Sequence, residues 1–462
     1  MKNVLIKNGM VILEDTQQKK DIRIADSIIK TIDDEIMPEE GEEILDAGGC
    51  FIMPGGVDVH THFDMPADVD LKTSDDFYTG TRAALAGGTT TIIDFAEPDP
   101  KGPLMEGLDI WHEKADGRSF CDYSFHMTVP RFDEEMPDQL TEMIKSGIPT
   151  FKAYTAYQDS LGVTDAELYR IMQSVKAADG VLCIHCENGD ILKCRQADLR
   201  KEDAACIKNH ALSRPNLVEK EAVSKVVDMA ELTGACVYIV HISTKEAMEV
   251  VERAKKRGVK VKAETCPHYM YLDDSKYELP GFEGAKYVMS PPLRSKEDMK
   301  ALVSKLKDGV VDTVATDHCS FNYRGQKERG RNDFTAIPNG IPAVEQRMEL
   351  MLELAEREEI PLYKIAQLTA LNPAKIFGMY PKKGVLRAGS DADIIVVQPD
   401  RTHVISKETQ YQDVDYTPFE GIVIHSRIQH VFLRGEQAVR EGKLIKETPS
   451  GEFLYREYLT NR

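Results

Sequence analysis

Short, nearly continuous apolar runs alternate with amphipathic segments through the middle of the chain. Runs without polar alternation are typical of strands buried on both faces, and the intervening segments 165–178, 218–233 and 245–257 have the apolar spacing of helices. This alternation predicts an α/β fold, a TIM (β/α)₈ barrel, with an open doubly wound sheet as the alternative. The expected strands are 56–60, 90–95, 123–127, 150–154, 181–186, 237–241, 259–264 and 312–317.

Both chain ends have a different pattern, with short strands of period two separated by tight turns. Such strands are expected at 4–7, 10–13, 21–25 and 28–32, and again at 393–397 and 429–433. Asn8-Gly9 predicts a hairpin turn between the first two. We expect both ends to pair into one small β-sandwich domain. The predicted organisation is the N-terminal part of the sandwich at 1–53, the barrel at 54–375, the C-terminal part of the sandwich at 376–440 and a tail at 441–462.

Composition narrows the possible partners. The 462 residues carry a net charge of -19, which repels phosphate backbones and disfavours nucleic acid as a partner. There is neither a signal-peptide pattern nor a run of about 18 apolar residues, so we expect a cytoplasmic protein with no membrane contact. Nine scattered cysteines fit free thiols in a reducing compartment. Cys183 and Cys186 would form a zinc or redox pair only if they faced one another, whereas positions three apart on a strand point to opposite sides.

Residue types that bind metals stand at the ends of five predicted strands. His60 and His62 lie two positions apart, so both side chains project from the same face of the first strand. Any one of these residues alone is more often structural than functional. The carboxyl ends of barrel strands converge on one rim, however, so all of them would meet there. Their joint placement predicts a metal centre formed by His60, His62, Lys152, His185, His241 and Asp317.

Lys152 is the unusual member of this set because an ammonium group cannot bind a cation. Its amine can react with carbon dioxide to give a carbamate, whose two oxygens can bridge two divalent ions. Imidazole and carboxylate ligands without a thiolate favour Zn²⁺, with Mn²⁺, Fe²⁺ and Co²⁺ as alternatives. Two ions about 3.5–4 Å apart share a hydroxide and polarise a carbonyl group. Asp317 can bind one ion and also carry a proton from that hydroxide to a leaving nitrogen.

The ordered set of motifs resembles the hydantoinase and dihydropyrimidinase family of cyclic amidohydrolases over essentially the whole chain. The resemblance implies metal-dependent hydrolysis of the cyclic amide bond of 5-monosubstituted hydantoins or dihydropyrimidines, which yields N-carbamoyl amino acids. Allantoinase, another cyclic amide or imide hydrolase, and a non-catalytic scaffold of the same fold are the alternatives. The segment 151–158 is similar to that of bacterial phenylhydantoinases. The stretches that carry the resemblance include PGGVDVHTHFDMP (54–66), FKAYTAYQ (151–158), CIHCENGD (183–190), ETCPHY (264–269), SPPLR (290–294), ATDHCSFN (315–322) and IPNGIPAVE (337–345).

The family resemblance also implies a role for each residue. Of the histidines, His60 and His62 would bind the more buried ion, and His185 and His241 would bind the other. The carbamate on Lys152 would bridge both ions. Tyr157 would donate a hydrogen bond to the developing oxyanion. The ring amide would be held, largely through backbone groups, by Ser290 and Asn339, whose surroundings also fit ordinary turns.

The resemblance further implies a homotetramer assembled with help from the C-terminal tail. The tail carries an apolar cluster, whose alternative role is docking on the chain's own surface. The cluster consists of Phe453, Leu454, Tyr455 and Tyr458.

Two observations bear on the substrate. Asp64 stands where relatives that act on dihydroorotate have an arginine for the substrate carboxylate, so we expect neutral substrates. The segment 65–76 is expected to lie over the ring substituent. An apolar pocket for that substituent is predicted from residues that would otherwise be ordinary packing at the top of the barrel, namely Phe63, Met65, Phe95 and Tyr154.

Overall fold

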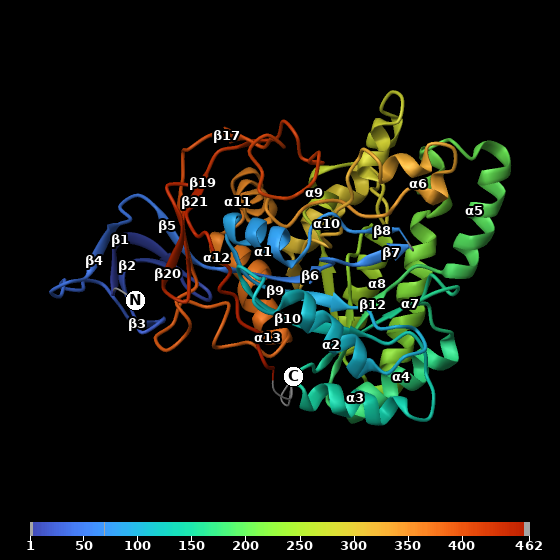
Figure 1. Ribbon diagram of the computed structural model, residues 1–462, viewed down its shortest axis with the longest axis horizontal. Coiled ribbons are helices and arrows are strands. Elements are labelled where there is room, and N and C mark those ends of the chain that lie inside the picture. The colour runs from blue at the N-terminus through green and yellow to red at the C-terminus, as the bar shows by residue number, and fades with distance from the viewer. Residues whose placement is uncertain (1–2, 69, 457–462) are drawn as a thin grey trace.

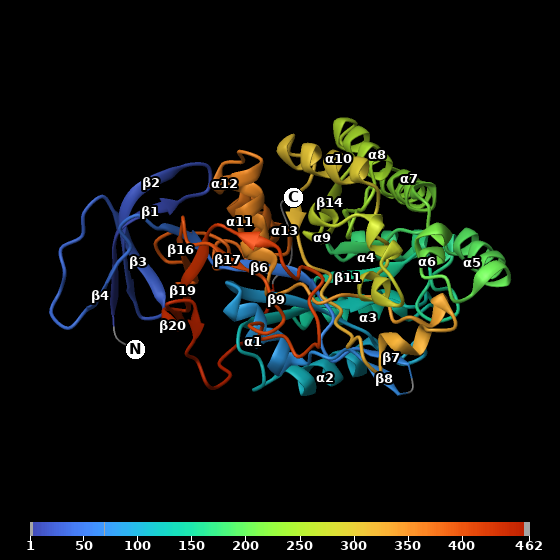
Figure 2. The ribbon, with the colours of Figure 1, turned by 90° about the horizontal axis from the view of Figure 1, so that it is seen from above.

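A computed structural model describes residues 3–68 and 70–456 and contains an eight-stranded parallel barrel (Figures 1 and 2). Each strand pairs with the next one along the chain, and a bridge between Thr61 and His318 joins the last strand's extension to the first strand. The predicted barrel is therefore confirmed. Its strands are β6 (Gly56–Thr61), β9 (Thr89–Ala96), β10 (Asp122–Thr128), β11 (Thr150–Tyr154), β12 (Val181–His185), β13 (Val237–Ile239), β14 (Val261–Thr265) and β15 (Thr313–Val314).

Helices surround the barrel, and most of them bury one face. Thr164 caps the start of α4. Its hydroxyl accepts from the backbone N–H of Glu167, and the Glu167 carboxylate accepts from the backbone N–H of Thr164, so the free N–H groups of the first turn are satisfied. The buried residues of α4 recur at helical spacing: Leu168, Ile171, Met172 and Val175. The main helices are α1 (Phe77–Ala86), α2 (Leu104–Ala115), α3 (Met136–Lys145), α4 (Asp165–Ala177), α5 (Gly189–Asp203), α7 (Asn216–Thr233), α8 (Lys245–Lys256), α10 (Lys296–Lys307) and α11 (Arg347–Arg357).

Strands from the two chain ends join in one nine-stranded sheet beside the barrel, as predicted (Figure 1, blue and red). β5 pairs antiparallel with β16, which connects the N-terminal strands to the C-terminal ones. Apolar side chains of both groups, including Ile6, Ile52 and Ile394, form a separate core for this sheet. The strands are β1 (Val4–Ile12), β2 (Gln17–Ala25), β3 (Ile28–Asp33), β4 (Glu43–Asp46), β5 (Phe51–Pro54), β16 (Ile394–Gln398), β19 (Arg427–Leu433), β20 (Glu436–Arg440) and β21 (Lys443–Leu444).

The hairpin predicted at Asn8-Gly9 is wrong, because β1 continues through both residues. The pairing of β1 with β2 shifts register there, so the dipeptide forms a bulge within the strand. Asn8 has a φ of 65° and its backbone N–H donates to Asp21 at 2.9 Å. A Cβ atom at Gly9 would lie 2.3 Å from the Ile52 side chain, so this position requires glycine. The left-handed backbone that suits Asn-Gly to a hairpin also suits it to a bulge.

A buried lysine joins the end sheet to the barrel. The Nζ atom of Lys383 lies 2.5 Å from an Asp122 oxygen at the start of β10, and 2.8 Å from oxygens of both Asp391 and Asp393, which precede β16. Its side chain is fully buried, so these ion pairs are shielded from solvent. They fix the end sheet against the amino-terminal side of the barrel, away from the rim that carries the candidate site.

The C-terminal tail packs on its own chain. The ring of Phe453 stacks on that of Phe125 with centroids 5.8 Å apart, and the buried Leu454 donates its backbone N–H to Tyr123. Tyr455 is largely exposed, and Tyr458 lies outside the described residues. Throughout residues 3–68 and 70–456, every helix is too short or too polar to cross a bilayer.

Candidate metal centre

The strand ends bring all of the predicted ligand residues to one cavity at the carboxyl rim of the barrel. His60 lies within β6 and Lys152 within β11, while His185 ends β12. His241 and Asp317 follow their strands, with left-handed φ values of 38° and 50°. Such strained backbone is retained where the surrounding structure holds it, which is common at functional sites. The cavity is lined by His60, His62, Lys152, His185, His241 and Asp317.

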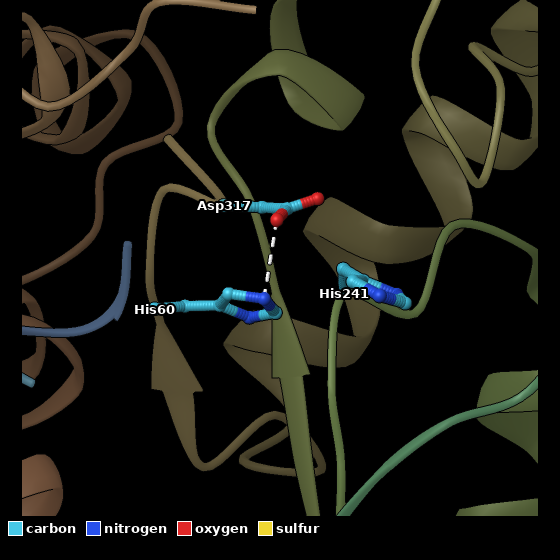
Figure 3. A group of neighbouring side chains, drawn as sticks. All are labelled: His60, His241 and Asp317. Carbon is cyan, nitrogen blue, oxygen red and sulfur yellow. Dashed lines mark ion pairs between the residues drawn. The ribbon is translucent and has the colours of Figure 1, made fainter. Parts of the chain in front are cut away.

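One side of the centre is built around the Asp317 carboxylate (Figure 3). Its Oδ1 atom lies 3.1 Å from Nε2 of His60 and 3.4 Å from Nε2 of His62. The ligand atoms of His60, His241 and Asp317 all lie within 4.8 Å of one another, which is close enough for a shared ion. The buried Nδ1 of His62 has no hydrogen-bond partner among the described residues.

The other side is formed by two histidines that face each other. Nδ1 of His185 lies 3.0 Å from Nε2 of His241, while Nε2 of His185 lies 2.9 Å from the Glu187 carboxylate. That carboxylate also accepts from Arg214 at 2.5 Å. Glu187 therefore holds the proton on Nε2 of His185 and leaves Nδ1 as a lone pair directed toward His241. Two imidazole nitrogens converging in this way suit a common cation.

Lys152 is buried between these two sides of the centre. Across the described parts of the chain its ammonium group has no hydrogen bond or ion pair, and lies over the rings of Phe95 and Tyr154 at 4.3 and 5.2 Å. Burial lowers the pKa of Lys152, which favours the neutral amine. The neutral form is the one that reacts with carbon dioxide, so this position fits a carbamate.

The carboxylates around His60 favour positive charge at the centre. Burial alone would lower its pKa, but the carboxylates of Glu264 and Asp317 raise the pKa of His60 to about 9. Burial also opposes ionisation of Asp317, yet its neighbour His60 holds the pKa of Asp317 well below the ordinary value. By contrast, burial lowers the pKa of His62 to about 4, which favours a neutral ligand. The donor set therefore fits a divalent cation, which would supply positive charge among these carboxylates.

Acidic residues behind the ligands were not anticipated from the sequence. Oε1 of Glu264 lies 2.7 Å from Nδ1 of His60 and accepts from the His241 backbone N–H at 2.8 Å. The Tyr238 hydroxyl donates to the other oxygen at 2.7 Å. Glu264 ends the seventh predicted strand, so the rule that identified the ligands would also have found it. Arg214 and Glu187 are brought together by the fold and carry no comparable sequence signal.

Three predicted substrate residues line the same cavity, which has a volume of about 510 Å³: Tyr157, Ser290 and Asn339. Tyr157 lies beside His185 with ring centroids 5.2 Å apart, and burial raises the pKa of its hydroxyl, so this group remains a donor at neutral pH. The Ser290 hydroxyl and the Asn339 side-chain oxygen are buried and have no hydrogen-bond partner among the described residues. Unpaired buried polar groups are rare unless a ligand satisfies them.

Buried Lys327 connects the two segments that carry Ser290 and Asn339. Its Nζ atom donates to the backbone oxygens of Val288 and Pro338, both at 2.9 Å. Sequence reasoning missed Lys327, because nothing in its local pattern marks it as buried.

The expectation that Asp64 faces the substrate is wrong. Its carboxylate pairs with Lys72 at 2.6 Å, and Asp64 is not among the residues that line the cavity. Its backbone has a left-handed φ of 49° in the segment that follows β6. The predicted apolar pocket is also only partly present, since Met65 lines the cavity whereas Phe63 is buried in the core.

The segment 65–76 does reach the cavity, through the hairpin of β7 (Pro66–Asp68) and β8 (Leu71–Lys72). Phe95 lies beneath the site, against His60 and Lys152, rather than in its wall. Tyr154 lines the wall, but its hydroxyl donates to Glu97, an acidic residue of the cavity that sequence analysis missed.

Comparison with known proteins gives consistent matches. The model of the Amidohydrolase family matches residues 51–438. The chain is 39% identical over 454 residues to a D-hydantoinase of Geobacillus stearothermophilus, covering 98% of this chain and 96% of the relative. It is 35% identical over 457 residues to a D-phenylhydantoinase of Escherichia coli O1:K1 / APEC, covering 98% of both. The crystal structure of dihydropyrimidinase from Brevibacillus agri NCHU1002 matches with a TM-score of 0.97 and 37% identity, covering 100% of both chains.

Proposed function

The chain belongs to the amidohydrolase family, and on this premise we propose that it hydrolyses the cyclic amide bond of 5-monosubstituted hydantoins or dihydropyrimidines to N-carbamoyl amino acids. The observation that carries this proposal is the composition of one cavity, where a donor set for cations lies beside the unpaired polar atoms of Ser290 and Asn339. A cyclic amide offers an N–H and a C=O group to such atoms. A non-catalytic scaffold would not need the complete ligand set.

We assign two divalent cations to this centre, with Zn²⁺ favoured and Mn²⁺, Fe²⁺ or Co²⁺ as alternatives. Such cations lower the pKa of water and polarise a carbonyl group. One ion would be held by His60, His62 and Asp317, and the other by His185 and His241. The buried amine of Lys152 would carry carbon dioxide as a carbamate shared by both. The converging nitrogens, the unpaired Lys152 and the raised pKa of His60 support this assignment.

Side chains of the cavity carry out the remaining steps of the reaction. Asp317 takes a proton from the attacking water and delivers it to the leaving ring nitrogen, because its carboxylate stays ionised in the site. The Tyr157 hydroxyl donates to the carbonyl oxygen as negative charge develops there. Ser290 and Asn339 hold the ring amide so that the scissile carbonyl stays in one orientation.

A substrate panel tests the proposal. The metal-loaded protein is assayed with dihydrouracil, hydantoin, 5-phenylhydantoin, allantoin and dihydroorotate. We expect kcat/KM for 5-phenylhydantoin or dihydrouracil to exceed that for dihydroorotate at least tenfold, or about 1.4 kcal/mol. The acid that repels the dihydroorotate carboxylate would be Glu97 instead of Asp64. Preferred hydrolysis of allantoin or dihydroorotate would assign the chain to those activities, and turnover of none would favour the scaffold.

Assembly and location are further proposals. We propose a homotetramer, as the resemblance implies, with the exposed Tyr455 available at its surface. Light scattering on protein eluted from a size-exclusion column measures the mass of the assembly directly. A monomeric mass would contradict the homotetramer. A cytoplasmic location is supported by nine cysteines that are all free thiols.

A further inference from the structure

One wall of the cavity carries a carboxyl group that takes no part in the proposed chemical steps. Glu97 directly follows β9 and lines the cavity together with the metal-centre residues. The Tyr154 hydroxyl donates to Oε1 of Glu97 at 3.3 Å. Within residues 3–68 and 70–456, Glu97 accepts no other hydrogen bond and forms no ion pair. A carboxylate removed from bulk water is costly unless its oxygens are satisfied, so this group is suited to a ligand.

The basic side chains around the cavity form no ion pair with Glu97 in the part of the chain that the structure describes. Lys114 donates to the backbone oxygen of Asp64 at 2.8 Å, and Arg329, which also lines the cavity, donates to the backbone oxygen of Asp70 at 2.9 Å. The charge of Lys152 acts on Glu97 from beyond ion-pair distance, and the proposed carbamate would remove that positive charge. The carboxyl group therefore faces the cavity without an ion-pair partner among the described residues.

The barrel order places Glu97 on a different part of the rim from the groups that hold the ring amide. Glu97 follows the second barrel strand, whereas Ser290 lies in the loop after the seventh strand and Asn339 in the loop after the eighth. Around the closed barrel, Glu97 is therefore three strands from the loop of Ser290 and two strands from that of Asn339. A ring whose amide is held by these two loops can direct a substituent toward Glu97.

The cavity that Glu97 lines also has apolar side chains. They are Met65, Ala67 and Leu71 from the segment over the cavity, and Leu161. A substituent with a short alkyl stem would be covered by these side chains and would place its end group near Glu97. An end group with positively charged N–H donors would satisfy the free carboxylate oxygen.

We propose that Glu97, oriented by Tyr154, forms a subsite for cyclic amides whose ring substituent is a short alkyl chain ending in a cation, such as a primary ammonium group. This inference rests on the proposed function and adds a substrate class to it. The cation pairs with the carboxylate in a region shielded from solvent, where opposite charges attract more strongly than in water. An anionic end group in the same place is repelled.

A matched pair of hydantoins tests the subsite. 5-(3-Aminopropyl)hydantoin and 5-butylhydantoin have the same length and differ in the charge of the last group. We expect the wild-type chain to favour the amine by at least about tenfold in kcat/KM, the usual value of one charge-assisted hydrogen bond. Glu97→Gln, which keeps the shape but removes the charge, is expected to reduce this preference to less than about threefold. Glu113→Gln removes the same charge from an exposed position of α2 and should keep the wild-type preference.

Binding measured without turnover tests the Glu97 subsite separately from the proposed ring hydrolysis. Calorimetry gives the dissociation constants of both hydantoins for two proteins: the Asp317→Asn variant and the same variant that also carries Glu97→Gln. A preference for the amine that depends on Glu97 supports the subsite even if turnover is poor. Equal binding of both hydantoins, or a preference unchanged by Glu97→Gln, contradicts the subsite while leaving ring hydrolysis intact. If neither hydantoin binds or reacts, the subsite and the proposed function are both contradicted. Tighter binding of 5-(2-carboxyethyl)hydantoin than of the amine would contradict a subsite for positively charged end groups.

Discussion

Oε1 of Glu264 lies 2.7 Å from Nδ1 of His60, so a buried carboxylate directly contacts one ring of the proposed metal centre. The hydrogen bond keeps the proton on Nδ1 and leaves Nε2 facing Asp317. Residues behind metal ligands commonly control ligand basicity and orientation in this way.

Removing this carboxylate is expected to weaken metal binding. Glu264→Ala should lower affinity for the bound ions about 10- to 100-fold, whereas Glu264→Gln should lose less because its amide oxygen can still accept from Nδ1. Competition with a chelator measures this affinity, with Glu113→Ala as a surface control. Equal affinities in Glu264→Ala and wild type would show that the contact does not orient the ring.

The bridging role proposed for Lys152 predicts a characteristic pattern of loss and rescue. Metal analysis of the wild-type chain should give about two divalent ions per chain. Lys152→Ala should lose metal and activity, because no anion then lies between the two sets of histidines. Acetate or propionate should restore part of both by taking the place of the carbamate. Unimpaired activity in Lys152→Ala, without any added acid, would exclude the bridge.

Asp317 is expected to act as both ligand and base, and the two roles can be separated. Asp317→Asn keeps an oxygen for the metal but cannot accept a proton at the site. We expect kcat to fall steeply while part of the metal remains bound. Steady-state kinetics and elemental analysis on the same sample measure both properties. Near wild-type kcat in a metal-loaded Asp317→Asn protein would assign the base to another residue.

Tyr157 tests the assignment of the oxyanion donor. Tyr157→Phe removes only the hydroxyl and should reduce kcat by about 10²–10³, with a smaller change in KM. Metal content is the control, because the ring that packs beside His185 is retained. A loss of less than about threefold would indicate that Tyr157 contributes packing alone.

Lys327 is expected to act on substrate binding at a distance. It connects the backbone at Val288 to that at Pro338, next to the segments of Ser290 and Asn339. Lys327→Met should leave the Pro338 carbonyl group unpaired, which costs about 1–3 kcal/mol and loosens both segments, while the Val288 oxygen still accepts from the Gly340 backbone N–H at 3.0 Å. We expect a higher KM with metal content preserved, measured together with the melting temperature. A fall in stability without any change in KM would make Lys327 purely structural.

The sequence alone was sufficient for the barrel and for bringing the six proposed ligand residues to one cavity, since both depend on local patterns. The apolar runs predicted strand positions to within a few residues, as for 150–154 and β11. The proposed ligand residues at strand ends could be predicted without knowing the loops, because a closed parallel barrel brings the carboxyl end of every strand to one rim. The same reasoning placed Cys183 and Cys186 on opposite sides of β12, in the barrel interior and the outer core.

Tertiary structure decided which other side chains reach the cavity. Asn8-Gly9 carries the same signal for a hairpin and for a bulge, and only pairing with β2 distinguishes them. Asp64 and Glu97 are both acidic residues that follow barrel strands, yet one pairs with Lys72 outside the cavity and the other lines its wall. The direction of a side chain in a loop depends on contacts with segments far away in the sequence, and such contacts leave no periodic trace in the residues themselves.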